Sequence, residues 1–370
     1  MLQVFRLQRG ILPGWICAAT LVSLLVLAGC VISPRRTLGG GGGGTPTPTP
    51  TGTPTSTPTP TPGATPAGKL YVSNSGTSSI LRFDQALTAS GNIVPGATIS
   101  GAATTLNAPA YITLDAVADR LFVSNRTNAS ILIFDNISTK NGNIAPERTL
   151  AGANTTMAAP TDVALDKSRN LLYVADDIDI PVFSSAATAT GNIAPARSLG
   201  LTFTVSAIFL DSTNDRLFAA NSAGNAIAVF DNASTLNGPV TANRTIVGAA
   251  THLGAPAGIQ IDGAGRLVVS NASSHNITIY NNAAGATGNL APSAEIVGSN
   301  TGLSVPDQII LNTAGTGSLY NADPGAARIA VFSNLSSSTG NIAPGRAIVG
   351  PSTTLTVAGQ PVGLALDTTR

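Results

Sequence analysis

The sequence has few charged residues and almost no net charge. Lys, Arg, Asp and Glu make up 10% of its 370 residues, and the net charge is +1, whereas an average soluble domain has about 25% charged residues. Four of the nineteen basic residues and none of the eighteen acidic residues precede residue 68, so the chain from there on carries fifteen basic and eighteen acidic side chains. Such a weakly acidic domain produces no field that attracts phosphates. The composition therefore excludes nucleic acid as a partner.

Cysteine is also scarce, and the positions of the two cysteines indicate the compartment. Cys17 lies inside an apolar run over residues 11–29, and Cys30 directly follows that run. Because Arg6 and Arg9 precede it, the run has the basic and apolar regions of a secretory signal peptide. An uncleaved anchor helix is the alternative, since nineteen residues nearly span a bilayer.

The end of this run resembles the lipobox of bacterial lipoprotein signal peptides. The residues that carry the resemblance are Leu27-Ala28-Gly29-Cys30. The resemblance implies that residues 1–29 are removed and that acyl chains on Cys30, palmitate among them, attach the protein to a membrane. We therefore expect an extracytoplasmic protein of the bacterial cell envelope, in the outer membrane where the host has one. The mature chain then has no free thiol and no disulfide, so its stability depends on its core.

Residues 30–67 have the composition of a linker. Residues 39–44 are six glycines, and residues 45–66 are mostly alternating Thr and Pro. Too little apolar surface is present here to offset the entropy of folding, and Pro-rich chains extend by about 3.1 Å per residue. We predict a disordered stalk that holds the following domain away from the membrane.

From residue 68 onward the sequence is repetitive. A block of the Leu-Tyr-Val-Ser-Asn type occurs six times, with substitutions, at intervals of 45 to 52 residues. Most copies also carry Gly-Asn-Ile-x-Pro. A further run opens on Pro and closes on Asp in most copies, at residues 109–115, 160–166, 205–211, 256–262, 306–312 and 361–367. Four short strand-like runs in about 50 residues, repeated, are typical of a propeller blade. We predict an all-β, six-bladed β-propeller of four-stranded blades over residues 68–370, with helices nearly absent.

The two ends of the repeat region complement each other. The first repeat lacks a Pro-to-Asp run ahead of Leu70, and an extra run over residues 361–367 ends the chain. If the two ends are joined, Asp367 precedes Leu70 by six positions, the spacing that separates Asp166 from Leu172. We expect the C-terminal strand to complete the first blade and close the ring, which also protects sheet edges.

The Pro-x-Gly-Ile-x-Val-Asp and Leu-Tyr-Val-Ala-Asn patterns of residues 68–370 resemble those of NHL-type and YVTN-type propellers. The resemblance implies the fold but not a function, because such propellers include protein-binding, RNA-binding, ligand-binding and enzymatic members. The family glycine is present as Gly258 and Gly363 in two of the innermost strands. Other residues replace it in the remaining four strands: Tyr111, Asp162, Ala207 and Gln308.

Residues for metal-dependent chemistry are scarce. The resemblance to propellers that hydrolyse lactones or phosphoesters would imply a metal held near the channel by Glu, Asp, Asn and His. The only two glutamates, Glu147 and Glu295, are expected at outermost strands, and the only two histidines, His252 and His275, in loops without ligand spacing. Because these ligands are scarce, a lactonase-like, metal-dependent hydrolase at the channel mouth is the alternative and not the leading hypothesis. No cofactor is expected.

Polar residues gather where the repeat departs from its own pattern. Because consecutive strands are antiparallel, the start of each innermost strand and the end of the next lie on one face. Ten residues are expected there: Tyr111, Asp162, Asp307 and Gln308, together with Asn74, Asn125, Asp176, Asn221, Asn271 and Asp323. Such a ring suits a polar ligand or a cation such as Ca²⁺. The alternative is that these side chains only satisfy the backbone of their own turns.

These observations lead to one functional hypothesis. We expect a monomeric, lipid-anchored binding or interaction module of the cell envelope. Its partner would be an envelope protein or a polar ligand. A structural envelope protein that binds nothing is a further alternative.

Overall fold

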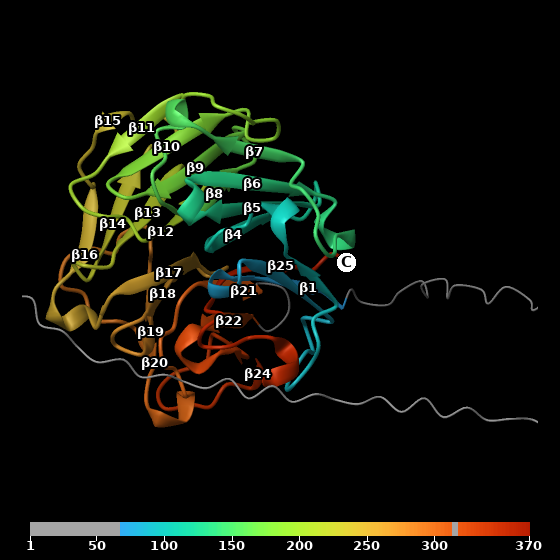
Figure 1. Ribbon diagram of the computed structural model, residues 1–370. Helices are drawn as coiled ribbons and strands as arrows, with labels where there is room; N and C mark the ends of the chain where they lie inside the picture. The colour runs from blue at the N-terminus through green and yellow to red at the C-terminus, as the bar shows by residue number, and fades with distance from the viewer. Residues whose placement is uncertain (1–66, 313–316) are drawn as a thin grey trace, which may run out of the picture. The chain divides into compact units, whose positions relative to one another are not determined.

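The computed structural model describes residues 67–312 and 317–370, and these residues form a ring of six twisted sheets (Figure 1). The predicted all-β, six-bladed propeller is confirmed. The predicted signal peptide, the predicted lipidation site Cys30 and the rest of the predicted stalk up to residue 66 lie outside the described residues. In the described part of the chain, no helix is long and apolar enough to span a membrane.

Blades 1 to 3 each contain four antiparallel strands. Their bounds, from the innermost strand outward, are β25 (Pro361–Asp367), β1 (Lys69–Asn74), β2 (Ser79–Asp84) and β3 (Ala97–Ile99) in blade 1; β4 (Pro109–Asp115), β5 (Arg120–Asn125), β6 (Ser130–Asp135) and β7 (Arg148–Ala151) in blade 2; and β8 (Pro160–Asp166), β9 (Leu171–Asp176), β10 (Asp179–Ser184) and β11 (Arg197–Gly200) in blade 3.

Blades 4 to 6 repeat this order. Their strands are β12 (Ala207–Asp211), β13 (Arg216–Asn221), β14 (Ala226–Asp231) and β16 (Arg244–Val247) in blade 4; β17 (Pro256–Ile261), β18 (Leu267–Asn271), β19 (Asn276–Tyr280) and β20 (Ala294–Ile296) in blade 5; and β21 (Ile309–Asn312), β22 (Ser318–Asp323), β23 (Arg328–Phe332) and β24 (Arg346–Val349) in blade 6. The short β15 (Gly238–Pro239) of blade 4 pairs with β11 of blade 3.

Helical structure in the described residues consists of three-residue 3-10 turns. Four of them lie within blades, between consecutive strands: η1 (Ser75–Thr77), η3 (Arg126–Asn128), η4 (Ile137–Thr139) and η8 (Pro324–Ala326). Five lie in the connections between blades: η2 (Ala102–Thr104), η5 (Ala153–Thr155), η6 (Ala249–Thr251), η7 (Ser299–Thr301) and η9 (Pro351–Thr353). The predicted near-absence of helices thus agrees with the described part of the chain.

The chain ends close the ring as predicted. Strand β25 pairs antiparallel with β1, with Lys69 opposite Asp367 and Tyr71 opposite Ala365. The Gly68 backbone N–H donates to the Arg370 carbonyl at 3.0 Å, so the two ends of the domain are neighbours. Figure 1 shows the C-terminus beside the first blade.

The hydrophobic core is divided among the blade junctions. Each of six apolar clusters lies mainly between two neighbouring blades. One aromatic residue of the third strand of each blade is at most 1% exposed: Phe83, Phe134, Phe183, Phe230, Tyr280 and Phe332. Because every blade buries both of its faces against neighbouring blades, a single blade would expose its apolar side chains to water.

The Gly-Asn-Ile motif joins neighbouring blades at the outer rim. Gly142 of blade 2 bridges in parallel to Ile99 of blade 1, and the Asn143 side chain accepts the Ala103 backbone N–H at 2.8 Å. The same bridge recurs at Gly91, Gly191, Gly288 and Gly340. Asparagine supplies an acceptor to a backbone N–H that the start of the 3-10 turn leaves unpaired. The repeat therefore encodes a link between blades as well as the blades themselves.

Side chains also link the inner part of each blade to the innermost strand of a neighbouring blade. At every junction a hydroxyl donor, or the Gln308 amide oxygen as acceptor, bonds to the backbone of a neighbouring innermost strand. The contacts are Ser73 to Ala110 O, Thr113 to Val163 O, Thr161 to Val205 O, Ser206 to Pro256 O, Ser270 to Asp307 O, and Leu364 N to Gln308. This circle of bonds fixes the inner strands around the channel.

Candidate ligand site in the central channel

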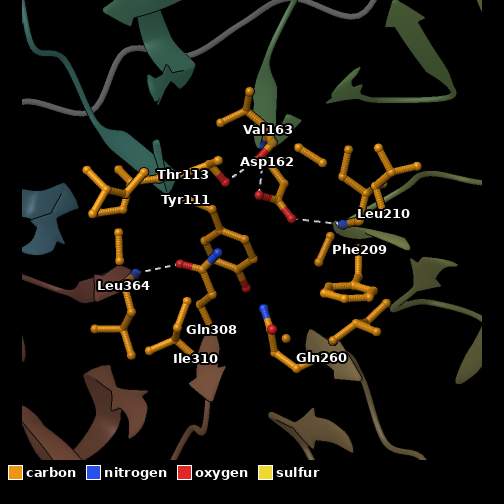
Figure 2. Close-up of a pocket in the computed structure, with 18 of the residues that line it drawn as sticks. Tyr111, Thr113, Asp162, Val163, Phe209, Leu210, Gln260, Gln308, Ile310 and Leu364 are labelled. Carbon is orange, nitrogen blue, oxygen red and sulfur yellow. Dashed lines mark hydrogen bonds between the residues drawn. The ribbon is translucent and has the colours of Figure 1, made fainter. Parts of the chain in front are cut away.

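The six innermost strands enclose a cavity of about 210 Å³ on the axis of the ring. Figure 2 shows Tyr111, Asp162, Gln260 and Gln308 converging on its middle. The Phe209 ring also lines it, and among the residues that line the cavity none is Lys or Arg. The cavity is therefore polar, partly aromatic and free of positive charge.

Glycine at the family position permits close approach between neighbouring inner strands. A Cβ on Gly363 would lie 2.4 Å from the Ser73 hydroxyl and 2.6 Å from the Ala110 carbonyl oxygen, and a Cβ on Gly258 only 2.9 Å from the Ser270 hydroxyl. Such contacts are too short for a side chain. Blades 1 and 5 consequently keep glycine opposite serine.

In blades 3, 4 and 6, side chains replace this glycine where the opposing residue is alanine instead of serine. Ala175 lies opposite Asp162, and Ala220 lies opposite Ala207. In blade 6, Ala322 lies opposite Gln308: the Ala322 N–H donates to the Gln308 carbonyl at 3.0 Å, and the Ala322 carbonyl accepts the Asp307 N–H at 2.8 Å. These substitutions create room for the side chains of Asp162 and Gln308 at one end of the channel, where Tyr111 also lies.

Asp162 is a buried carboxyl group held by the backbone. It is 3% exposed, and its two oxygens accept the N–H of Val163 at 2.7 Å and the N–H of Ile208 at 2.8 Å. Burial raises the pKa of Asp162 to about 7, although both hydrogen bonds act to lower it. The group therefore changes charge near neutral pH.

Tyr111 reaches across the channel from blade 2 to blade 6. Its hydroxyl donates to the Asp307 carboxylate, and the residue is only 7% exposed. Burial, followed by the charge of Asp307, raises the pKa of Tyr111 well above 10. Burial also raises the pKa of Asp307 to about 7, which the Tyr111 hydrogen bond partly opposes. Tyr111 thus remains a neutral donor while Asp307 titrates.

Two glutamines retain free polar groups in the cavity. Gln308 uses its amide oxygen to accept the Leu364 N–H. Among the described residues, neither its amide nitrogen nor any side-chain atom of Gln260 has a hydrogen-bond partner. A ligand in the cavity would find both a donor and an acceptor unused.

The structure separates the ten residues of the expected ring into two groups. Tyr111, Asp162 and Gln308 line the cavity, and Asp307 joins them through Tyr111. The other six are not among the lining residues, and they bond locally: Asn74 to Thr354 O, Asn125 to Asn107 N, Asp176 to Ala158 N and Ala159 N, Asn221 to Gly224 N, Asn271 to Gly254 N, and Asp323 to Val305 N. Only Asn221 bonds within its own turn; the other five bond to the backbone of the loop that leads into the innermost strand of their blade.

The residues weighed for metal chemistry lie away from the cavity. Glu147 pairs with Lys140, and Glu295 lies in β20. The His252 Nδ1 atom is 3.0 Å from the Glu295 carboxylate, and His275 lies in the turn before β19. In the described ranges, no group of three or more His, Cys, Asp or Glu residues is placed to hold a metal ion.

Sequence reasoning missed Phe209 and Gln260. Both lie two residues after the family glycine position, and alternate residues of a strand share a face. Each innermost strand therefore presents two positions to the channel, the family glycine position and the position two residues later. The second position could have been predicted from the alternation of side chains along a strand. Thr113 and Ile310 occupy this second position in blades 2 and 6.

Comparison with known proteins adds the fold class. No protein-family model matches the chain, and no curated protein matches it. A functionally unknown protein from Desulfotomaculum acetoxidans DSM 771 is similar at 12% identity and a TM-score of 0.50, over 78% of this chain and 83% of that one. A chain in the crystal structure of a nidogen/laminin complex is similar at 14% identity and a TM-score of 0.52, over 81% and 98%.

At these identities the likeness is one of fold. The protein is a six-bladed β-propeller, a fold that it shares with these two structures. This fold commonly acts as a binding module, and its chemistry is decided by the residues at its sites.

Proposed function

We propose that the protein is a lipid-anchored binding module of the bacterial cell envelope, and that its channel binds a small organic cation. The observation that supports the ligand class is the pairing of two titrating carboxyl groups, Asp162 and Asp307, with a cavity that has no basic lining residue. The lipobox-like sequence Leu27-Ala28-Gly29-Cys30 supports the proposed lipid anchor.

An ammonium group matches this cavity better than a metal ion does. Ca²⁺ requires six to eight oxygen ligands, and both oxygens of Asp162 already accept backbone N–H groups. The Tyr111 and Phe209 rings offer faces that attract an organic cation. At about 210 Å³ the cavity is smaller than the roughly 300–1,000 Å³ of drug-sized sites, so the ligand has few non-hydrogen atoms.

The ligand is tested by calorimetric titration of the full-length protein with choline and with its uncharged isostere 3,3-dimethylbutan-1-ol. We expect choline alone to bind, and its affinity to rise between pH 6 and pH 8 as the carboxyl groups ionise. Asp307→Asn should weaken binding about tenfold or more by removing one charge. Asp211→Asn, at the other end of an innermost strand, is the matched control. Equal binding of the isostere, or binding independent of pH, would contradict the ligand class.

The anchor is tested by labelling cells with radioactive palmitate. We expect label in the wild-type protein and none in Cys30→Ser, which should accumulate as a precursor that retains its signal. Label that persists in Cys30→Ser would contradict lipidation at this residue.

A lactonase-like hydrolase is the alternative function. Lactones and phosphoesters assayed with Ca²⁺, Mn²⁺ and Zn²⁺ distinguish it, because turnover that is lost in Asp162→Ala would replace the binding proposal. The described residues offer no cluster of metal ligands, which is why binding is preferred.

A further inference from the structure

The connection between blades 3 and 4 is shorter than the corresponding connections. Pro160 of the next innermost strand follows Leu150 of the outer strand by ten positions, whereas Val205 follows Leu199 by only six. Among the described residues this connection lacks the 3-10 turn that the other five connections contain. The blade 3–4 junction therefore misses a segment that the other junctions use.

That missing segment normally fills the junction. After each 3-10 turn, one Leu or Met packs into the apolar cluster of its junction, namely Leu106, Met157, Leu253, Leu303 and Leu355. Between blades 3 and 4, Leu201 and the partly buried Phe203 are the nearest substitutes. They cover the same region with fewer residues.

Small residues on blade 4 enlarge the gap. Ala226 and Ala228 lie on the face of β14 that also carries Phe230. Blades 1 and 2 have Leu81 and Leu132 at the position of Ala228. The shorter connection and the smaller side chain of Ala228 thus both reduce the number of protein atoms in the same region of this junction.

A pocket of about 280 Å³ occupies this place. Phe203, Phe230 and Val240 form its apolar wall, and no ionisable residue lines it. Its polar groups are the Asn221 amide and the hydroxyls of Thr202, Thr241 and Thr245. Within the described residues none of these three hydroxyls has a hydrogen-bond partner, and Asn221 uses only its oxygen, toward Gly224.

We propose that this pocket, defined as the blade 3–4 pocket, binds a small uncharged ring compound that carries a hydroxyl group. The volume lies near the lower end of ligand sites, and the aromatic wall suits a ring. A charged ligand would lose its hydration without gaining a partner, whereas a hydroxyl finds the free threonine and asparagine groups at the edge. The site is separate from the channel and does not depend on the function proposed for it.

The test uses phenol as the probe and the full-length protein labelled at threonine methyl groups. We expect the Thr245 signal to shift and saturate with a dissociation constant of about 1 mM, because seven non-hydrogen atoms bind only weakly. Thr245→Val, followed through the Thr241 signal, should weaken binding about threefold to tenfold through loss of one hydrogen bond. The matched control is Thr98→Val at the equivalent position of blade 1, which should leave binding unchanged.

Two variants fill the pocket. Ala228→Leu introduces the side chain that blades 1 and 2 carry and should weaken phenol binding at least tenfold. If Ala228→Leu does not fold, as judged by circular dichroism, Ala242→Leu at the partly exposed edge replaces it with the same expectation. The proposal is overturned if the Thr245 signal does not saturate by 20 mM phenol, or if the folded filling variant binds like the wild type.

Discussion

Removal of the C-terminal strand tests the closed ring most directly. Deleting residues 361–370 takes away β25 and leaves β1 without its inner partner. Leu364 is 1% exposed and packs between blades 6 and 1 with Leu70 and Val72, and the partly buried Leu366 packs against the same cluster. A fully buried leucine contributes about 1.5–3 kcal/mol, so the buried Leu364 and the partly buried Leu366 together contribute about 3–5 kcal/mol.

This loss is comparable with the whole stability of many proteins, about 5–15 kcal/mol. At about 2–4 °C per kcal/mol in chains of this size class, we expect the melting temperature of the truncated protein to fall by about 10 °C or more. The assay is thermal unfolding followed by circular dichroism. Deletion of residues 39–66 is the control and should change the melting temperature by no more than about 2 °C, because a Gly- and Thr-Pro-rich stalk buries little surface.

Two outcomes would refute the reasoning. A protein without residues 361–370 that melts within about 2 °C of the full chain would show that β25 does not close the ring. Failure of a circular permutant would refute it as well. The permutant joins Arg370 to Gly68, whose backbone atoms already lie 3.0 Å apart in a hydrogen bond, and is reopened in a connection between two other blades.

Three further predictions follow from individual residues. Gly363→Ala should lower the free energy of unfolding in urea by about 1–3 kcal/mol, because its Cβ meets Ser73 and a carbonyl oxygen; adding Ser73→Ala should recover part of this loss, and strict additivity would contradict the contact. Asp307, with a folded-state pKa of about 7 against 3.8, binds its proton more tightly when folded, so its contribution to stability is full below about pH 4 and is lost as the pH rises through 7. The fall in stability between pH 5 and pH 8 should therefore be smaller in Asp307→Asn, and an unchanged slope would contradict this assignment. Trp15 is the only tryptophan, so mature protein extracted from membranes should show tyrosine emission only, and tryptophan emission would count against cleavage.

The repeats made the fold predictable. Six copies of each strand pattern fix the blade count, and the spacing from Asp367 to Leu70 across the joined ends predicts which strand closes the ring. The buried aromatic of each third strand was predictable for the same reason, because residues that recur six times in equivalent positions have equivalent neighbours.

The contacts between blades were not predictable from the same patterns. Gly-Asn-Ile is visible in the sequence, but its bridge from Gly142 to Ile99 joins residues of neighbouring repeats, and periodicity within one repeat carries no information on such pairs. The ring of asparagines was ambiguous for a related reason. An amide such as that of Asn125 can face a ligand or cap a nearby loop, and only the position of the Asn107 N–H decides between them.

Tyr111 departs from the pattern that the other replaced glycines follow. In blades 3, 4 and 6 alanine opposes the residue that replaces the family glycine, but Ser124 of blade 2 keeps the serine that accompanies glycine in blades 1 and 5. Its hydroxyl is buried and has no hydrogen-bond partner among the described residues. An unpaired buried hydroxyl costs about 1–3 kcal/mol. Tyr111 offsets part of that cost through its buried ring, which packs in an apolar cluster, and through its hydrogen bond to Asp307. Positions where a sequence departs from its own structural rule are also where function is expected.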